Sequence, residues 1–264
     1  MAEYKILLPV DGSRLAEHSL VYLQALRAMG DLNVLLLSVV EESEDFNGLS
    51  AVEAQEREFN ILSTYLREVG ADIDAHLGIH AEQKVVRGAP ASSILDEAER
   101  FAPDLLLIST HGRSGVSRWR FGSVADKVIR AAPSNTFVIG PKAGELSQWM
   151  EFELTQPFGR ILVPLDGSAL AEQAIEVARG FAECYSSQVH LVRAVPIPMV
   201  GNGFATEAYQ PDVLDTMTDL AKATSPTWLL ASTAQRQYRL MSLLGQRRLR
   251  SRTTSPRRGS ISLS

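Results

Sequence analysis

The first apolar run of the chain reads Tyr4-Lys5-Ile6-Leu7-Leu8-Pro9-Val10 and is followed by Asp11-Gly12-Ser13. A short, nearly continuous apolar run that ends in turn-forming residues is typical of a strand buried on both faces of a parallel sheet. Ser13 can then cap a helix, which the apolar spacing predicts from Arg14 to Met29. Asn33–Val40 is a second buried strand. The start of the chain therefore predicts a βαβ unit.

The same alternation of helices and strands continues to about residue 140. The expected elements are a helix from Val52 to Val69 that stops at Gly70, a third strand within Ile73–Val86, a helix from Pro90 to Phe101, a fourth strand over Asp104–Ser109, a helix from Val124 to Ala131 and a fifth strand over Thr136–Ile139. Strands and helices at this spacing predict an α/β fold, a doubly wound parallel five-stranded sheet with helices on both faces. We assign this complete domain to residues 1–142.

The opening stretch returns later in the chain. Residues 160–172 repeat residues 5–17 without a gap, at a constant offset of 155, and the repeat includes a second Asp-Gly-Ser. An agreement of this length predicts an internal duplication. A helix up to Gly180 and a strand over Gln188–Val195 continue it. We therefore predict a linker over 143–158 and a partial second domain over 159–223.

The resemblance between the two halves ends near Thr224. Residues 1–223 hold 18 Lys and Arg against 31 Asp and Glu, whereas residues 224–264 hold eight Arg and no acidic residue. One interpretation is a basic tail of low order that binds nucleic acid or another polyanion. The other, which we favour, is a shift of reading frame, because the acids, the lysines and the repeat all disappear at one point. Nucleic acid is therefore not an expected partner.

Composition sets the broad class of the protein. An apolar fraction of 45% and a charged fraction of 22% are ordinary for globular domains, and no apolar run is long enough to span a membrane. The N-terminus lacks the pattern of a secretory signal. The single cysteine, Cys184, cannot form an internal disulfide. The expected location is the cytoplasm, with no membrane partner.

Two loops stand where parallel strands of such a sheet are expected to bind ligands. They are Asp11-Gly12-Ser13, after the first strand, and Ser109 to Ser123, after the fourth. The second loop contains Gly112 and Gly115, and Gly122-Ser123 directly precedes a helix whose N-terminal amides attract phosphate. The pattern predicts a phosphate-binding loop, although the chain has neither a GxxxxGK[ST] loop nor a GxGxxG fingerprint.

These residues resemble the universal stress protein family. Its ATP-binding members have a glycine, two residues, a second glycine, nine residues, and then Gly-Ser or Gly-Thr. Here Gly112 matches the second glycine and Gly122-Ser123 the final pair, whereas Ser109 replaces the first glycine. The resemblance covers residues 3–141 and returns over 159 to about 223, which corresponds to a tandem form with a truncated or frameshifted second domain. It implies the strand order 3-2-1-4-5.

The resemblance also implies a ligand, a site and a mode of association. The implied ligand is ATP together with Mg²⁺, which would lie near Asp11. The implied partner is a second copy or a second domain joined through the fifth strand. The ATP-binding residues it implies are Asp11 near the ribose or a phosphate-bound Mg²⁺, Val39 with its backbone near the adenine, and Ser109, Gly112, Arg113, Gly122, Ser123 and Val124 on the phosphates. From the residues alone, Asp11 can also be read as a turn residue and Val39 as a core residue.

Three functions remain open. The first is an ATP-binding, cytoplasmic regulatory protein of the stress response, in which the nucleotide acts as a ligand. The second is a dimerising interaction module of the same fold that no longer binds nucleotide, for which Ser109 is the only support. The third is a slow ATPase. No nucleophile and base stand at a suitable spacing, so we do not expect an enzyme, and we read His111 as a structural or phosphate-contacting residue.

Overall fold

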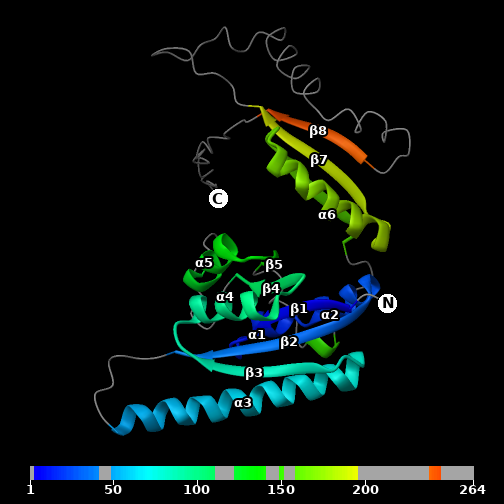
Figure 1. Ribbon diagram of the computed structural model, residues 1–264. Coiled ribbons are helices and arrows are strands. Elements are labelled where there is room, and N and C mark those ends of the chain that lie inside the picture. Colours follow the sequence, from blue (N-terminus) through cyan, green and yellow to red (C-terminus); the bar gives the residue numbers. More distant parts are fainter. Residues whose placement is uncertain are drawn as a thin grey trace, which may run out of the picture. The chain divides into compact units, whose positions relative to one another are not determined.

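The computed structural model describes residues 3–41, 49–110, 122–140, 149–151, 158–195 and 238–244. The chain divides into two compact units, Met1–Pro157 and Phe158–Ser264 (Figure 1). No helix in the described parts is long and apolar enough to cross a membrane.

The first unit is a parallel five-stranded sheet in the order β3-β2-β1-β4-β5, as predicted. Its strands are β1 (Glu3–Pro9), β2 (Asp31–Val40), β3 (Ala81–Arg87), β4 (Leu105–Ser109) and β5 (Asn135–Ile139). Its helices are α1 (Arg14–His18), α2 (Val21–Leu26), the 3-10 turn η1 (Arg27–Met29), α3 (Leu49–Leu77), α4 (Pro90–Phe101), α5 (Ser123–Ala131) and the 3-10 turn η3 (Trp149–Glu151).

The centre of this sheet is the strand predicted from the opening apolar run. Ile6, Leu7 and Leu8 of β1 are completely buried. Because side chains alternate between the faces of a strand, Leu7 packs on one face with Ile94 of α4 and Val128 of α5. Ile6 and Leu8 lie on the other face. Each such buried side chain contributes about 1.5–3 kcal/mol to stability, so both helical layers depend on this strand.

The expected helix from Arg14 to Met29 is interrupted. α1 ends at His18, and α2 begins at Val21. Between them the backbone N–H groups of Ser19 and Leu20 donate to carbonyls three residues back, those of Ala16 and Glu17. The Ser19 hydroxyl also donates to the Ala16 carbonyl. A serine that competes locally for a carbonyl in this way disturbs the regular four-residue hydrogen-bond pattern.

The prediction that Gly70 ends the second helix was wrong. α3 continues through Gly70 to Leu77 and lies alongside β3 (Figure 1). A Cβ atom at Gly70 would stand 2.4 Å from Nε2 of Gln83 on β3, so glycine leaves room for the Gln83 side chain against the helix. The helix ends instead at Gly78, which has φ of 62° and whose N–H donates to the Asp74 carbonyl. Ile73 is therefore helical and β3 starts only at Ala81.

We expect Gly78→Ala to lower the unfolding free energy by about 1 kcal/mol, because an L residue in the left-handed region is strained. No atom lies within 4 Å of the added Cβ, so the cost is one of backbone conformation alone. Gly78→Asn is the matched control and should cost less, since asparagine tolerates this conformation. Equilibrium denaturation of the full chain measures both. Equal stability of Gly78→Ala and the parent would contradict the assignment.

The second unit repeats the start of the first. It comprises β6 (Arg160–Leu165), α6 (Ala169–Tyr185), β7 (Gln188–Val195) and β8 (Tyr238–Leu244). The strands are parallel in the order β6-β7-β8, so β8 takes beside β7 the place that β3 takes beside β2. β7 has the predicted bounds, whereas α6 runs past Gly180. Gly180 does not have the positive φ of a helix-ending glycine, and α6 continues through it to Tyr185.

The proposed domain boundaries stay predictions. β8 lies within residues 224–264, the segment that we assigned to a basic tail. Of the proposed linker, only η3 and Phe158 belong to the described residues.

Candidate functional site

The two predicted ligand loops leave neighbouring strands at one edge of the sheet. β1 pairs with β2 on one side and with β4 on the other, so the strand order reverses between β1 and β4. Asp11-Gly12-Ser13 follows β1, and Thr110 follows β4. In open α/β sheets a crevice forms outside the carboxyl ends of the strands at this reversal. The topology thus places both loops at the position where such sheets bind ligands.

The loop after β1 is a compact turn. The Asp11 carboxylate accepts a hydrogen bond from the Ser13 N–H at 3.0 Å, and Ser13 Oγ accepts one from the Ala16 N–H at 3.3 Å. Gly12 between them has φ of 78°, which favours glycine. Ser13 is thus the helix cap that we predicted. Asp11 is a turn residue in this structure.

Ser38 of β2 fixes the start of this turn, a role that sequence reasoning missed. Its buried hydroxyl donates to the Val10 carbonyl at 2.6 Å, while the Val10 N–H donates to the Leu37 carbonyl at 2.9 Å. A lone serine in an otherwise apolar run was the available signal. The last pair between β1 and β2 is Pro9 with Leu37, so Val39 lies beyond this pairing. Its side chain is half-buried against the core.

The loop after β4 is closed at its base by hydrogen bonds. The buried residue Thr110 receives a hydrogen bond at its carbonyl from the Gly122 N–H, at 2.7 Å, and its own N–H donates to the Ile139 carbonyl of β5 at 2.9 Å. The chain therefore leaves from Thr110 and returns to Gly122 at the same point. Gly112 and Arg113, together with His111, lie outside the described residues. Ser109 is the last, half-buried residue of β4.

Helix α5 starts at this closure with its first-turn amides pointing back toward it. Gly122 is the N-cap residue, with φ of −59°, and it has no side chain to cap the helix. Ser123 and Val124 are the first two helical residues, and their N–H groups have no acceptor within the described residues. Uncapped N–H groups at a helix N-terminus, together with the helix dipole, favour an anion. Of the predicted phosphate contacts, the structure thus brings together Ser109, Gly122, Ser123 and Val124.

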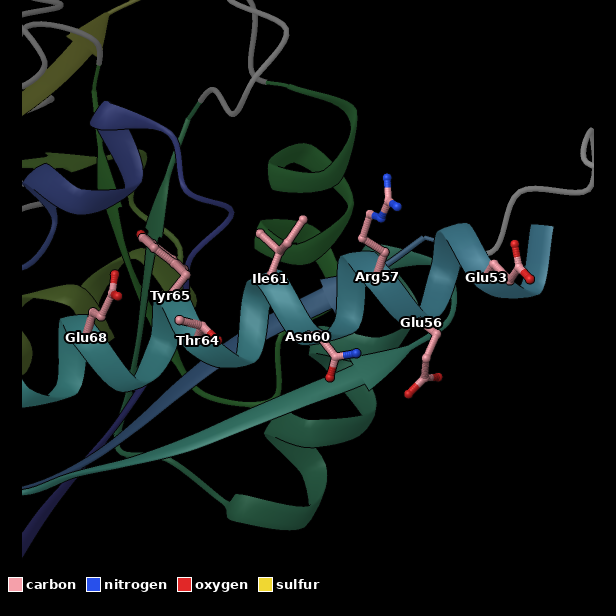
Figure 2. Close-up of a pocket in the computed structure, with 8 residues that line it drawn as sticks. All are labelled: Glu53, Glu56, Arg57, Asn60, Ile61, Thr64, Tyr65 and Glu68. Carbon is pink, nitrogen blue, oxygen red and sulfur yellow. The ribbon is translucent and has the colours of Figure 1, made fainter. Parts of the chain in front are cut away.

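A shallow groove on α3 lies outside the predicted site. It has a volume of about 780 Å³ and is lined by Glu53, Glu56, Arg57, Asn60, Ile61, Thr64, Tyr65 and Glu68 (Figure 2). Tyr65 lies close to the turn after β1. Burial, the negative charge of Glu17 and, to a smaller extent, that of Asp11 raise the pKa of the Tyr65 hydroxyl. Helix α3 therefore flanks the Asp11 turn, which the sequence pattern did not predict.

Comparison with known proteins establishes the family. The model of the universal stress protein family matches residues 4–140, about half of the chain. The chain belongs to the universal stress protein family. A universal stress protein of Methanocaldococcus jannaschii is 29% identical over 142 residues, which cover 51% of this chain and 81% of that protein. A second one from the same organism is 28% identical over 154 residues, covering 52% and 95%.

Among solved structures, a universal stress protein from Archaeoglobus fulgidus matches over 92% of this chain and 77% of its own, with a TM-score of 0.62. The identity is 19%, so this likeness concerns the fold alone. The family match and the strand order agree with the family resemblance of the sequence and with its expected topology.

We expect Tyr65→Phe to change how stability depends on pH. A tyrosine with a raised pKa in the folded state contributes stability that is present below the ordinary value of about 10 and is lost as the pH rises beyond it, because only the unfolded chain then ionises. Without the hydroxyl, the part of this loss of stability that comes from Tyr65 disappears. Chemical denaturation at about pH 9 and about pH 11 measures it. An unchanged pH dependence in Tyr65→Phe would show that the hydroxyl ionises freely in the folded protein.

Proposed function

We propose that this universal stress protein binds ATP at the carboxyl edge of the first sheet and uses the nucleotide as a regulatory ligand in the cytoplasm. The observation that carries the proposal is the uncapped start of α5, which is hydrogen bonded to Thr110 at the point of strand reversal. Gly122, Ser123 and Val124 would hold the phosphates with Gly112 and Arg113. Hydrogen bonds from amides to a charged phosphate contribute about 1.5–3 kcal/mol each.

The remaining residues are assigned to the nucleoside and the metal. Asp11 would approach the ribose or a Mg²⁺ ion held by the phosphates, and the Val39 backbone would meet the adenine. The described residues contain no group of three or more His, Cys, Asp or Glu side chains that could hold a metal ion by themselves. Mg²⁺ would therefore enter as part of Mg-ATP, with the phosphates supplying most of its ligands.

Nucleotide binding would act through conformation and association. ATP can shift an equilibrium between two states only by its difference in affinity for them. β5 is an edge strand of the first sheet, and we propose it as the strand through which family-type dimers form. No catalytic turnover is part of this proposal.

A second candidate is a dimerising module that does not bind nucleotide. It is favoured by Ser109, which replaces the first motif glycine and is half-buried at the end of β4. A side chain at this position occupies space that a close ligand approach would need.

We expect Gly122→Asp to weaken ATP binding at least tenfold. The backbone at Gly122, φ of −59° and ψ of 153°, suits an L residue, and aspartate is a favourable N-cap, so the fold should persist. The new carboxylate would accept hydrogen bonds from the first-turn N–H groups of α5, and its negative charge would repel the phosphates. Calorimetric titration with Mg-ATP measures this for the full chain.

The matched control is Gly159→Asp, which adds the same charge where a Cβ would meet no atom within 4 Å. It should bind like the parent. If the folded parent does not bind ATP at millimolar concentration, the nucleotide proposal fails and the second candidate stands.

A further inference from the structure

Tyr65 of α3 reaches the turn after β1 from a helix that lies far away in the sequence. Its neighbours Leu62 and Leu66 are buried, so this part of α3 is fixed on the sheet. In Figure 2 the Tyr65 side chain leaves α3 on the same side as Ile61, whereas Asn60 points to the other side. The residue is half-buried, and its hydroxyl oxygen is shielded from solvent. A tyrosine hydroxyl in such a place usually has a polar partner.

Two polar groups, one of the turn and one of α1, lie beside this hydroxyl. Burial and then the Glu17 carboxylate raise the pKa of Tyr65, whereas the Gly12 backbone lowers that pKa. A phenol is harder to ionise beside a carboxylate that accepts its proton in a hydrogen bond. It is easier to ionise beside a backbone N–H that donates to its oxygen. The hydroxyl therefore stands between an N–H of the turn and a carboxylate of α1.

The packing of α3 does not explain this hydroxyl. Within the described residues neither neighbour reaches the geometry of an ordinary hydrogen bond with it. A buried hydroxyl that is left without a full partner lowers the stability of a fold. The ring of a phenylalanine would fill the same space without that penalty. The hydroxyl of Tyr65 is therefore better explained by a role at the turn than by the stability of α3.

The two neighbours of the hydroxyl flank the residue that caps α1. Gly12 directly precedes Ser13, and Glu17 lies one helical turn after it, with its N–H donating to the Ser13 carbonyl at 3.0 Å. The Ser13 N–H in turn donates to the Asp11 carboxylate at 3.0 Å. A hydroxyl that bridges Gly12 and Glu17 would restrain the backbone on both sides of the cap. It would thereby also restrain the direction of the Asp11 carboxylate.

We propose that Tyr65 is a positioning residue of the nucleotide site, which bridges Gly12 and Glu17 and so holds Asp11 against the ribose. This inference rests on the proposed function, because Asp11 meets a ribose only if a nucleotide binds at this edge of the sheet. The phosphates are assigned to another element, the start of α5. Tyr65 therefore affects the affinity for a whole nucleotide and leaves the affinity for a bare triphosphate chain unchanged.

Calorimetric titration of the full chain with Mg-ATP tests the proposal. Tyr65→Phe should raise the dissociation constant about fivefold, as expected for the loss of one ordinary hydrogen bond. Tyr4→Phe is the matched control and should bind like the parent. Tyr4 is also half-buried, and burial together with Asp104 likewise raises the pKa of its hydroxyl, but it lies at the opposite end of β1 from the turn.

Equal affinities of Tyr65→Phe and the parent would overturn the role of Tyr65 and leave the nucleotide site in place. A folded parent that does not bind ATP would overturn both. A second titration, with Mg²⁺ removed by a chelator, separates positioning from a general effect on the fold. ATP should again bind more weakly to Tyr65→Phe, whereas inorganic triphosphate should bind as it does to the parent. Equal losses for the two ligands would contradict the proposal.

A double-mutant cycle identifies the bridge itself. Glu17→Ala removes the carboxylate at a helical position that suits alanine. In this background Tyr65→Phe should change the affinity for Mg-ATP little, because the bridge is already broken. The full loss of affinity in the Glu17→Ala background would show that the two residues act independently, and the bridge would then be wrong. Circular dichroism verifies that each variant retains its secondary structure.

Discussion

Everything in this fold depends on the requirement that a central parallel strand be covered on both faces and paired on both edges. In the first unit β1 meets this requirement: its residues Ile6, Leu7 and Leu8 are completely buried, and it pairs with β2 and β4. The reversal of strand order follows, because the chain adds strands first on one side of β1 and then on the other. The strand reversal between β1 and β4 is thus a consequence of burying β1.

The central strands were accessible from the sequence because a strand buried on both faces leaves an unambiguous apolar run. The strand order came from the family resemblance, and β3, with mostly exposed and half-buried residues, could be placed only within Ile73–Val86. β7 could even be bounded correctly by the offset from the first copy. The helix ends were less predictable. Gly70 and Gly78 look alike in the sequence, yet the first accommodates Gln83 and the second adopts a left-handed conformation. Only the packing distinguishes a glycine needed for space from one needed for backbone freedom.

In the candidate site, too, some features follow from the sequence and others only from the packing. A loop at the end of β4 and a turn at Asp11 follow from topology, and the glycine spacing indicates which chemistry belongs there. The contacts that hold the site in place do not follow from the sequence. They include the Ser38 hydroxyl on Val10 and the bond between Gly122 and Thr110. The approach of Tyr65 to the Asp11 turn also arises from tertiary packing, because α3 is separated from β1 in sequence but adjacent to its turn in space.

The glycine cap of α5 has a further thermodynamic consequence. A nine-residue helix with glycine as its N-cap is less stable, by roughly a few tenths of a kcal/mol, than one capped by serine or aspartate. An anion that binds the first-turn amides would remove this deficit, so occupancy and local folding become linked equilibria. The helix that contributes Val128 to the core beside Leu7 is the same one. The stability of α5 and of its contacts in this part of the core would therefore increase with the concentration of the anion.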